Sequence, residues 1–71
     1  MKTIILTAPQ AWGKTRNAEA LRKELGCARV VDDWYPPMGI TSGSLHLTNV
    51  HPSQLDPGYM LSAEQVSRGW A

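Results

Sequence analysis

The hydrophobic and polar positions divide the first half of the chain into three short segments. Residues 3–7 form a continuous run of β-branched and apolar residues, which is typical of a strand buried on both faces of a sheet. From Gly13 to Leu25 apolar residues recur at spacings of three and four, which predicts a helix, and Gly26 stands where its C-terminal cap belongs. Residues 27–31 are a second strand-like run. This order of strand, helix and strand predicts a βαβ unit with parallel strands.

A loop and a third strand follow this unit. Two prolines and two glycines between Trp34 and Gly43 exclude a regular helix there. Residues 44–50 alternate between polar and apolar side chains, as a strand does when one face is buried. Because a parallel crossover usually takes about a dozen residues or more, the direction of this strand stays open.

The C-terminal part is predicted to add a turn, a strand and a helix. Residues 56–58 read Asp-Pro-Gly, which suits a type II turn, and residues 59–61 are a candidate fourth strand. Ser62 and Gln65 have the spacing of a capping box, so a short helix is expected over residues 63–68.

These elements predict an α/β fold, a small and mainly parallel sheet of three to four strands with one long helix and a short C-terminal helix. With 71 residues the chain is one domain. A domain of this size buries only about 60% of the surface of its unfolded chain. We therefore expect the sheet face that lacks a helix to be covered by self-association as a dimer, by a protein partner or by the C-terminal segment.

Composition excludes several classes of protein. The net charge is +1 and the longest cationic cluster is Arg22-Lys23, so we expect no nucleic-acid binding. The single cysteine, Cys27, cannot form a disulfide within the chain and is expected to be a buried apolar residue. His46 and His51 are expected at the surface or at a sheet edge. No apolar run approaches the roughly 20 residues of a membrane span, so a soluble cytoplasmic protein is expected.

One motif carries candidate chemistry. Residues 8–15 read Ala-Pro-Gln-Ala-Trp-Gly-Lys-Thr, which matches the phosphate-loop pattern G-x-x-x-x-G-K-[ST] with alanine in the first position. In that pattern backbone N–H groups curl around a phosphate, and the following helix adds its free N–H groups and the positive end of its dipole. The motif follows a predicted strand and opens a predicted helix, which is the context that this chemistry needs.

Residues 3–33 resemble the opening βαβ unit of P-loop NTPases, especially nucleoside- and nucleotide-kinase-like and AAA-type members, and more weakly small phage and prophage proteins. The resemblance implies that Gly13 lets the backbone approach the phosphate, that Lys14 contacts the β- and γ-phosphates, and that Thr15 binds Mg²⁺. The implied cofactors are ATP or GTP and magnesium. A full P-loop domain is about twice this length or more, so the resemblance implies a truncated domain over residues 1–71.

The same resemblance assigns roles at the ends of the next two strands. Asp32 or Asp33 would hold Mg²⁺ through water or orient an acceptor group, and Asp32 is the candidate catalytic residue and metal ligand. Thr48 and Asn49 are similar to the polar residue that senses the γ-phosphate in AAA-type members. Ligands of open α/β sheets bind at the carboxyl ends of the strands, where all of these residues stand.

Three residues of the motif depart from the family's pattern. Ala8 replaces the first glycine, which the family tolerates. Ala11 replaces a glycine that many members use at positive φ, where a Cβ costs of order 1 kcal/mol. Trp12 stands where a small residue is usual. If its indole points away from the concave side of the loop a phosphate can bind there, whereas an indole that fills the loop excludes one.

The leading hypothesis is a mini-domain that binds a nucleotide or phosphate through Ala8, Ala11, Trp12, Gly13, Lys14 and Thr15. We expect hydrolysis to be absent or very slow, because no arginine is placed to stabilise the transition state. Whether the chain is an enzyme stays open. The alternative is a non-enzymatic interaction or inhibitor module that keeps a degenerate phosphate loop as scaffold and binds a protein through its aromatic residues, Trp34, Tyr35, Tyr59 and Trp70.

Overall fold

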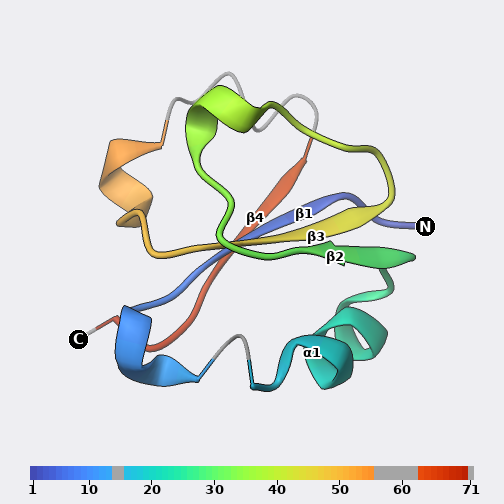
Figure 1. Cartoon of the computed structure of the whole chain (residues 1–71), viewed down its shortest axis with the longest axis horizontal. Coiled ribbons are helices and arrows are strands. Elements are labelled where there is room, and N and C mark those ends of the chain that lie inside the picture. The colour runs from blue at the N-terminus through green and yellow to red at the C-terminus, as the bar shows by residue number, and fades with distance from the viewer. Residues whose placement is uncertain (14–15, 56–62, 71) are drawn as a thin grey trace.

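Four strands form one sheet in which all neighbours run parallel (Figure 1). The computed structural model describes residues 1–13, 16–55 and 63–70. The strands lie in the order β2-β3-β1-β4. Their bounds are Ile4–Thr7 for β1, Arg29–Val31 for β2, Ser44–Thr48 for β3 and Glu64–Ser67 for β4. The predicted α/β class and parallel sheet are confirmed, and the third strand, whose direction the sequence left open, is parallel.

β1 occupies the interior of the sheet, between β3 and β4. Ile4 stands opposite Leu45 on one side and Glu64 on the other. All four residues of β1 are buried, as expected of a strand with neighbours at both edges and cover on both faces. Successive side chains point to opposite faces, so Ile4 and Leu6 join one hydrophobic cluster and Ile5 joins another.

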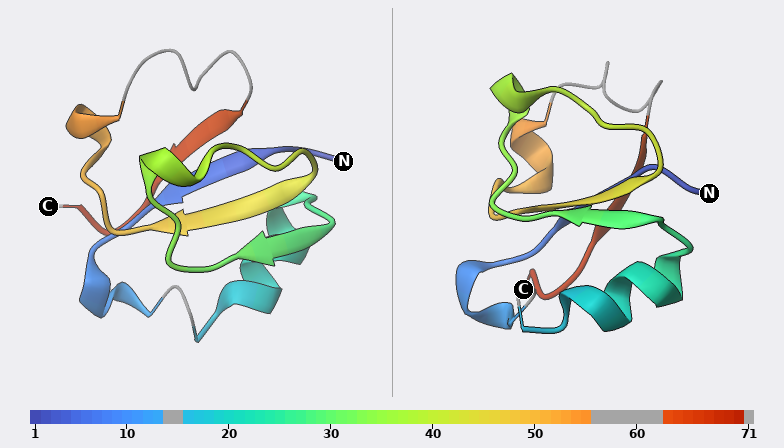
Figure 2. Two further views of the ribbon diagram at one scale, coloured as in Figure 1. Left: turned by 45° about the horizontal axis from the view of Figure 1, so that its top comes forward. Right: turned by 45° about the vertical axis from the view of Figure 1, so that its right-hand side comes forward.

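One α-helix, α1 (Ala18–Leu25), covers the first face of the sheet (Figure 2). Leu21 is the buried residue of its apolar stripe, and Ala18 and Leu25 pack beside it. The cluster between helix and sheet comprises Ile4, Leu6, Leu21, Cys27, Leu45 and Leu47. Cys27 is buried there, as predicted. No helix in the described part of the chain is long and apolar enough to cross a membrane.

The predicted start of the long helix is wrong, because α1 begins at Ala18 and not at Gly13. Gly13 has a φ of 88° and ends a short 3₁₀ turn, η1 (Gln10–Trp12). The side-chain amide of Asn17 donates to the carbonyl of Gly13 over 3.0 Å, a local bond of the kind by which asparagine competes with helix. The other end agrees with the prediction, since Gly26 caps the helix with a φ of 73°.

The chain itself covers the second face of the sheet. Residues 32–43, with the turn η2 (Pro36–Met38), and the segment after β3, with the turn η3 (Pro52–Gln54), lie over this face in Figures 1 and 2. Their side chains build a second cluster around Ile5, Trp34, Leu55 and Ala63. This face is therefore covered within the chain, and it does not require a dimer or a protein partner to cover it.

The C-terminal helix predicted over residues 63–68 is wrong, because this segment contains β4. β4 pairs with β1 in parallel register, with Ile4 opposite Glu64 and Thr7 opposite Ser67. Without it, β1 would expose a row of unpaired N–H and C=O groups at a sheet edge. Pairing with β1 therefore determines the conformation of this segment, against the helix that the capping-box spacing favours. The candidate turn at 56–58 and the candidate strand at 59–61 lie outside the described residues.

The expectation that His46 lies at the surface is also wrong, because its side chain is fully buried in β3. Its Nε2 accepts the backbone N–H of Thr41 over 2.9 Å, so the proton of the neutral ring is on Nδ1. Nδ1–H donates to the carbonyl of Ile4, also over 2.9 Å. The ring meets the indole of Trp34 edge to face, with centroids 5.7 Å apart. His46 thus ties the loop over the second face to the sheet.

Candidate functional site

The carboxyl ends of β1 and β3 lie side by side and then separate. The backbone N–H of Ala8 donates to the carbonyl of Thr48 over 3.1 Å, one step beyond the last strand pair, Thr7 and Thr48. From here the chain after β1 runs through η1 to α1 on the first face, while the chain after β3 runs through η3 over the second face (Figure 2). Open α/β sheets bind their ligands at such a place. We call it the switch point and define it by Ala8 and Thr48.

The phosphate-loop motif leaves β1 at the switch point. Ala8 is fully buried, and Ala11 and Trp12 belong to η1. Lys14 and Thr15, which carry the charge and the hydroxyl of the motif, lie outside the described residues. The described part of the motif is therefore the strand end and the tight turn that leads into the loop.

Gly13 and Trp12 explain part of this local geometry. Gly13 takes a φ of 88°, which residues with a Cβ rarely adopt. Among the described residues, a methyl group on Gly13 would meet the side chain of Asn17, at an ordinary contact distance of 3.6 Å, so the positive φ is the constraint that calls for glycine. Trp12 is half-buried and packs against the cluster under α1.

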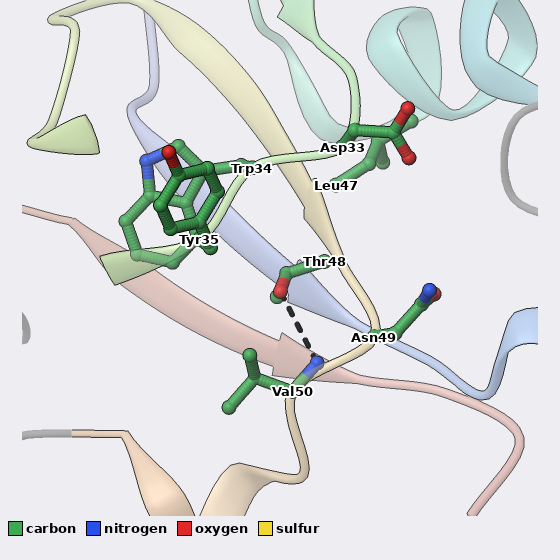
Figure 3. A pocket seen from close by; sticks show the side chains of 7 residues that line it. All are labelled: Asp33, Trp34, Tyr35, Leu47, Thr48, Asn49 and Val50. Atoms are coloured by element: carbon green, nitrogen blue, oxygen red, sulfur yellow. Dashed lines mark hydrogen bonds between the residues drawn. The ribbon is translucent and has the colours of Figure 1, made fainter. Parts of the chain in front are cut away.

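A cavity of about 310 Å³ opens at the carboxyl ends of β2 and β3, next to the switch point (Figure 3). Oγ1 of Thr48 accepts the backbone N–H of Val50 over 3.1 Å, which holds this side chain in the wall. The ring of Tyr35, which is 54% exposed, lines the opposite part. The full lining is Asp33, Trp34, Tyr35, Leu47, Thr48, Asn49 and Val50. Apolar and aromatic walls with a few polar groups are the usual composition of a small-molecule site.

The two adjacent carboxylates stand just beyond β2 and differ in position. Asp33 lines the cavity, whereas Asp32 is exposed outside its lining. The backbone N–H of Asp33 donates to Oδ1 of Asp32 over 2.9 Å. Asp33 has a φ of 52°, a left-handed conformation that is uncommon for residues other than glycine. The sequence pointed to Asp32 as the catalytic residue, whereas Asp33 is the acidic residue of the cavity lining. Its carboxylate points away from Tyr35, Thr48 and Val50 in Figure 3.

Sheet order limits what Asp32 can do for a magnesium ion. β3 separates β2 from β1, so the ends of β2 and β1 are two strand spacings apart, about 10 Å. Mg²⁺ commonly keeps several waters and binds one or two carboxylates together with phosphates. At this separation Asp32 would reach an ion bound at the end of β1 only through bridging water. Within residues 1–13, 16–55 and 63–70, no three His, Cys, Asp or Glu side chains gather as a metal site of their own.

Tyr35 and Val50 belong to the cavity although no motif marks them. The one signal that could have found them is position, because each follows the end of a strand by a few residues. In a parallel sheet all such residues gather along one edge. Thr48 and Asn49, which the resemblance did mark, line the same cavity.

Comparisons of the chain with protein-family models, with curated proteins and with solved structures found no match. The likeness to P-loop NTPases therefore rests on the motif and on its place after a buried parallel strand.

Proposed function

We propose that the protein binds a nucleotide, ATP or GTP, or another phosphate-bearing ligand, with the phosphates on residues 8–15. One observation carries this proposal. The motif begins where the chain after β1 and the chain after β3 turn to opposite faces of a parallel sheet (Figure 2). This is the general ligand-binding place of open α/β sheets, and backbone N–H groups after a strand are a general means of holding phosphate.

Trp12 supports the proposal. Its indole packs against the cluster under α1, so the bulky side chain that departs from the family's pattern has a place in the core. An indole used in this way is taken up by the core. The backbone N–H groups of Ala8 and Trp12 donate to the carbonyls of Thr48 and Pro9, so a phosphate would be held by other N–H groups of residues 8–15. Gly13, with its positive φ, supplies the sharp change of direction that a phosphate-binding loop needs.

The cavity suits the uncharged part of such a ligand. Asp33 belongs to the lining, and its negative charge disfavours a phosphate there. Tyr35 offers an exposed ring against which a planar group can stack. Phosphates on the motif and a sugar or base in the cavity would place a nucleotide along the carboxyl edge of the sheet.

Magnesium would be held by the phosphates and by Thr15, with Asp32 reached through water. We expect hydrolysis to be absent or very slow. The guanidinium of Arg68 is paired with Glu24 over 3.1 Å, and a free, placed cation is what fast phosphoryl transfer needs.

The alternative, a protein-interaction module, rests on fewer residues than the sequence suggested. Trp34 is only 2% exposed and belongs to the core, Trp70 is half-buried, and Tyr59 lies outside the described residues. What supports this candidate is the exposed pair Tyr35 and Met38, at 54% and 49%.

Thermal unfolding with saturating ATP–Mg²⁺ tests the proposal. A ligand at about 100 times its Kd adds roughly 2.7 kcal/mol to the free energy of unfolding, which raises the midpoint of so small a domain by roughly ten degrees or more. We expect this rise in the wild type and in Lys23→Ala, a control that removes an exposed cation from α1. Lys14→Ala should show none.

The same unfolding measurement with inorganic triphosphate or with adenosine shows which part of the nucleotide contributes to binding. A rise with triphosphate alone would assign the affinity to the motif, and a larger rise with ATP would add the cavity. No rise with any of these ligands, or an equal rise in Lys14→Ala, would contradict the proposal.

A further inference from the structure

The last described residues of the chain lie across the carboxyl end of β1. The backbone N–H of Arg68 donates to the carbonyl of Thr7 over 2.9 Å, which extends the β4 ladder. The indole Nε1–H of Trp70 donates to Oγ1 of the same threonine over 3.3 Å. Thr7 is fully buried, so this segment closes over the strand end from which the phosphate-loop motif departs.

Between these two contacts, Gly69 touches the motif itself. A methyl group placed on Gly69 would collide with Cδ1 of Trp12 and lie 3.0 Å from its Cγ and Nε1. Gly69 also has a φ of 78°, so glycine is required both for its conformation and for the contact. The indole of Trp12 is thereby held between the backbone of Gly69 and the cluster under α1.

Two further contacts attach this segment to elements on both sides. The ring of Trp70 meets the ring of His51 edge to face, with centroids 4.9 Å apart. Arg68 pairs with Glu24 of α1, and both side chains are well exposed, so this ion pair adds little. The segment therefore contacts β1, η1, α1 and the chain that enters η3.

We infer that residues 68–70 form an intramolecular clamp that fixes η1, and with it the start of the phosphate loop, before any ligand arrives. Gly69 is its positioning residue and Trp12 is the side chain that it holds. The consequence for binding rests on the proposed function. A loop that is already ordered loses less conformational freedom when it takes up a ligand, so the clamp raises affinity without touching the ligand.

Gly69→Ala is the direct test, and Gly39→Ala is its matched control. Gly39 has a φ of 74°, and no atom of the described residues lies within 4 Å of an added methyl. Both variants thus carry the strain of alanine at positive φ, and only Gly69→Ala drives a methyl group into Trp12. The readout is hydrogen exchange at the backbone amide of Trp12, which donates to the carbonyl of Pro9 over 3.1 Å.

The clamp predicts that exchange at this amide becomes about tenfold faster in Gly69→Ala, because overpacking displaces the indole. Amides of the interior strands should change no more than in Gly39→Ala, which separates local loosening from a loss of global stability. Unchanged exchange at Trp12, or the same change in both variants, would overturn the inference.

Trp70→Phe keeps the test decisive if Gly69→Ala does not fold. It retains an aromatic ring beside His51 and removes the donor to Thr7. We expect faster exchange at the Trp12 amide, by roughly fivefold for one lost hydrogen bond. No acceleration in this variant would count against the clamp.

Affinity for ATP–Mg²⁺ distinguishes the clamp from the proposed function. If the wild type binds, Gly69→Ala should bind roughly tenfold more weakly and Gly39→Ala equally well. Equal affinity in Gly69→Ala would overturn the contribution of the clamp and leave the nucleotide site standing. If the wild type does not bind, the proposed function fails, and the exchange measurement alone decides whether the clamp exists.

Discussion

The backbone N–H of Ala8 donates to the carbonyl of Thr48 over 3.1 Å. This bond joins the residue that opens the phosphate-loop motif to the residue that ends β3. Thr48 also accepts the N–H of Val50 through its hydroxyl oxygen, over 3.1 Å. One buried residue therefore fixes the strand end and the first turn of the chain that leaves it, at the mouth of the cavity.

Thr48→Val tests this double role of Thr48. Valine keeps the shape but removes the acceptor for the N–H of Val50, which should lower the free energy of unfolding by about 1–2 kcal/mol. Thr41→Val is the control, because Thr41 is exposed and no change beyond about 0.5 kcal/mol is expected there. Urea unfolding of both variants measures the difference, and equal stabilities would contradict the assignment.

Trp34 is predicted to act through stability and not through an exposed binding surface. Its Nε1–H donates to the carbonyl of Gly39 over 2.7 Å, and the ring is buried. Trp34→Phe should cost about 2–3 kcal/mol from lost volume and a lost hydrogen bond. Tyr35→Phe, at an exposed site, should stay within about 0.5 kcal/mol. Denaturant unfolding checks both, and a neutral Trp34→Phe would show that the second cluster does not depend on this ring.

His46→Phe should destabilise the loop over the second face. The substitution removes the ring nitrogen that accepts the N–H of Thr41 and the N–H that donates to the carbonyl of Ile4. The carbonyl of Ile4 keeps its place in the β1–β3 ladder, so the main loss is the acceptor for Thr41, and we expect a cost of about 1–3 kcal/mol. His51→Phe is the comparison, since His51 is exposed and loses only its cap on Ser53, worth about 1 kcal/mol. Faster hydrogen exchange at the amide of Thr41 in His46→Phe, but not in His51→Phe, would support the conclusion that His46 holds this loop to the sheet. Unaltered exchange in His46→Phe would refute it.

Cys27 gives the protein a dependence of stability on alkaline pH. Burial raises the pKa of its thiol above the ordinary value. The unfolded chain then loses the thiol proton at a lower pH than the folded chain does. The contribution to stability is complete below the ordinary pKa of about 8.5 and is lost as pH rises above it.

We therefore expect the free energy of unfolding to fall between about pH 8 and pH 9.5. Cys27→Ala should lack this part of the decline, and the native thiol should react slowly with a disulfide reagent. Urea unfolding across this pH range measures the effect. The same slope in Cys27→Ala would show that other groups cause the decline.

The strength of each local pattern decided which elements could be predicted from the sequence. Residues 3–7 are β-branched or apolar without interruption, and all but the first of them form the interior strand β1. Gly26 follows a run of helix formers, and it caps α1. These signals are local, and nothing at long range opposes them.

The failures have long-range causes. Ser62 and Gln65 satisfy a helix rule, but the partner that makes a strand of residues 64–67 is β1, some 60 positions away in the sequence. His46 was expected at the surface because its two hydrogen-bond partners, Thr41 and Ile4, come from a loop and another strand. The cavity could not be predicted for the same reason, because its lining comes from the ends of two separate strands.

An amide NMR titration with inorganic triphosphate and Mg²⁺ tests the central claim most directly. We predict that signals from residues 11–16 shift and saturate, and that Lys14→Ala abolishes these shifts. Signals from Arg22 and Lys23, a cationic pair on α1, should stay where they are. Shifts confined to such exposed cations, or no shifts at all, would contradict a phosphate site at the carboxyl end of β1.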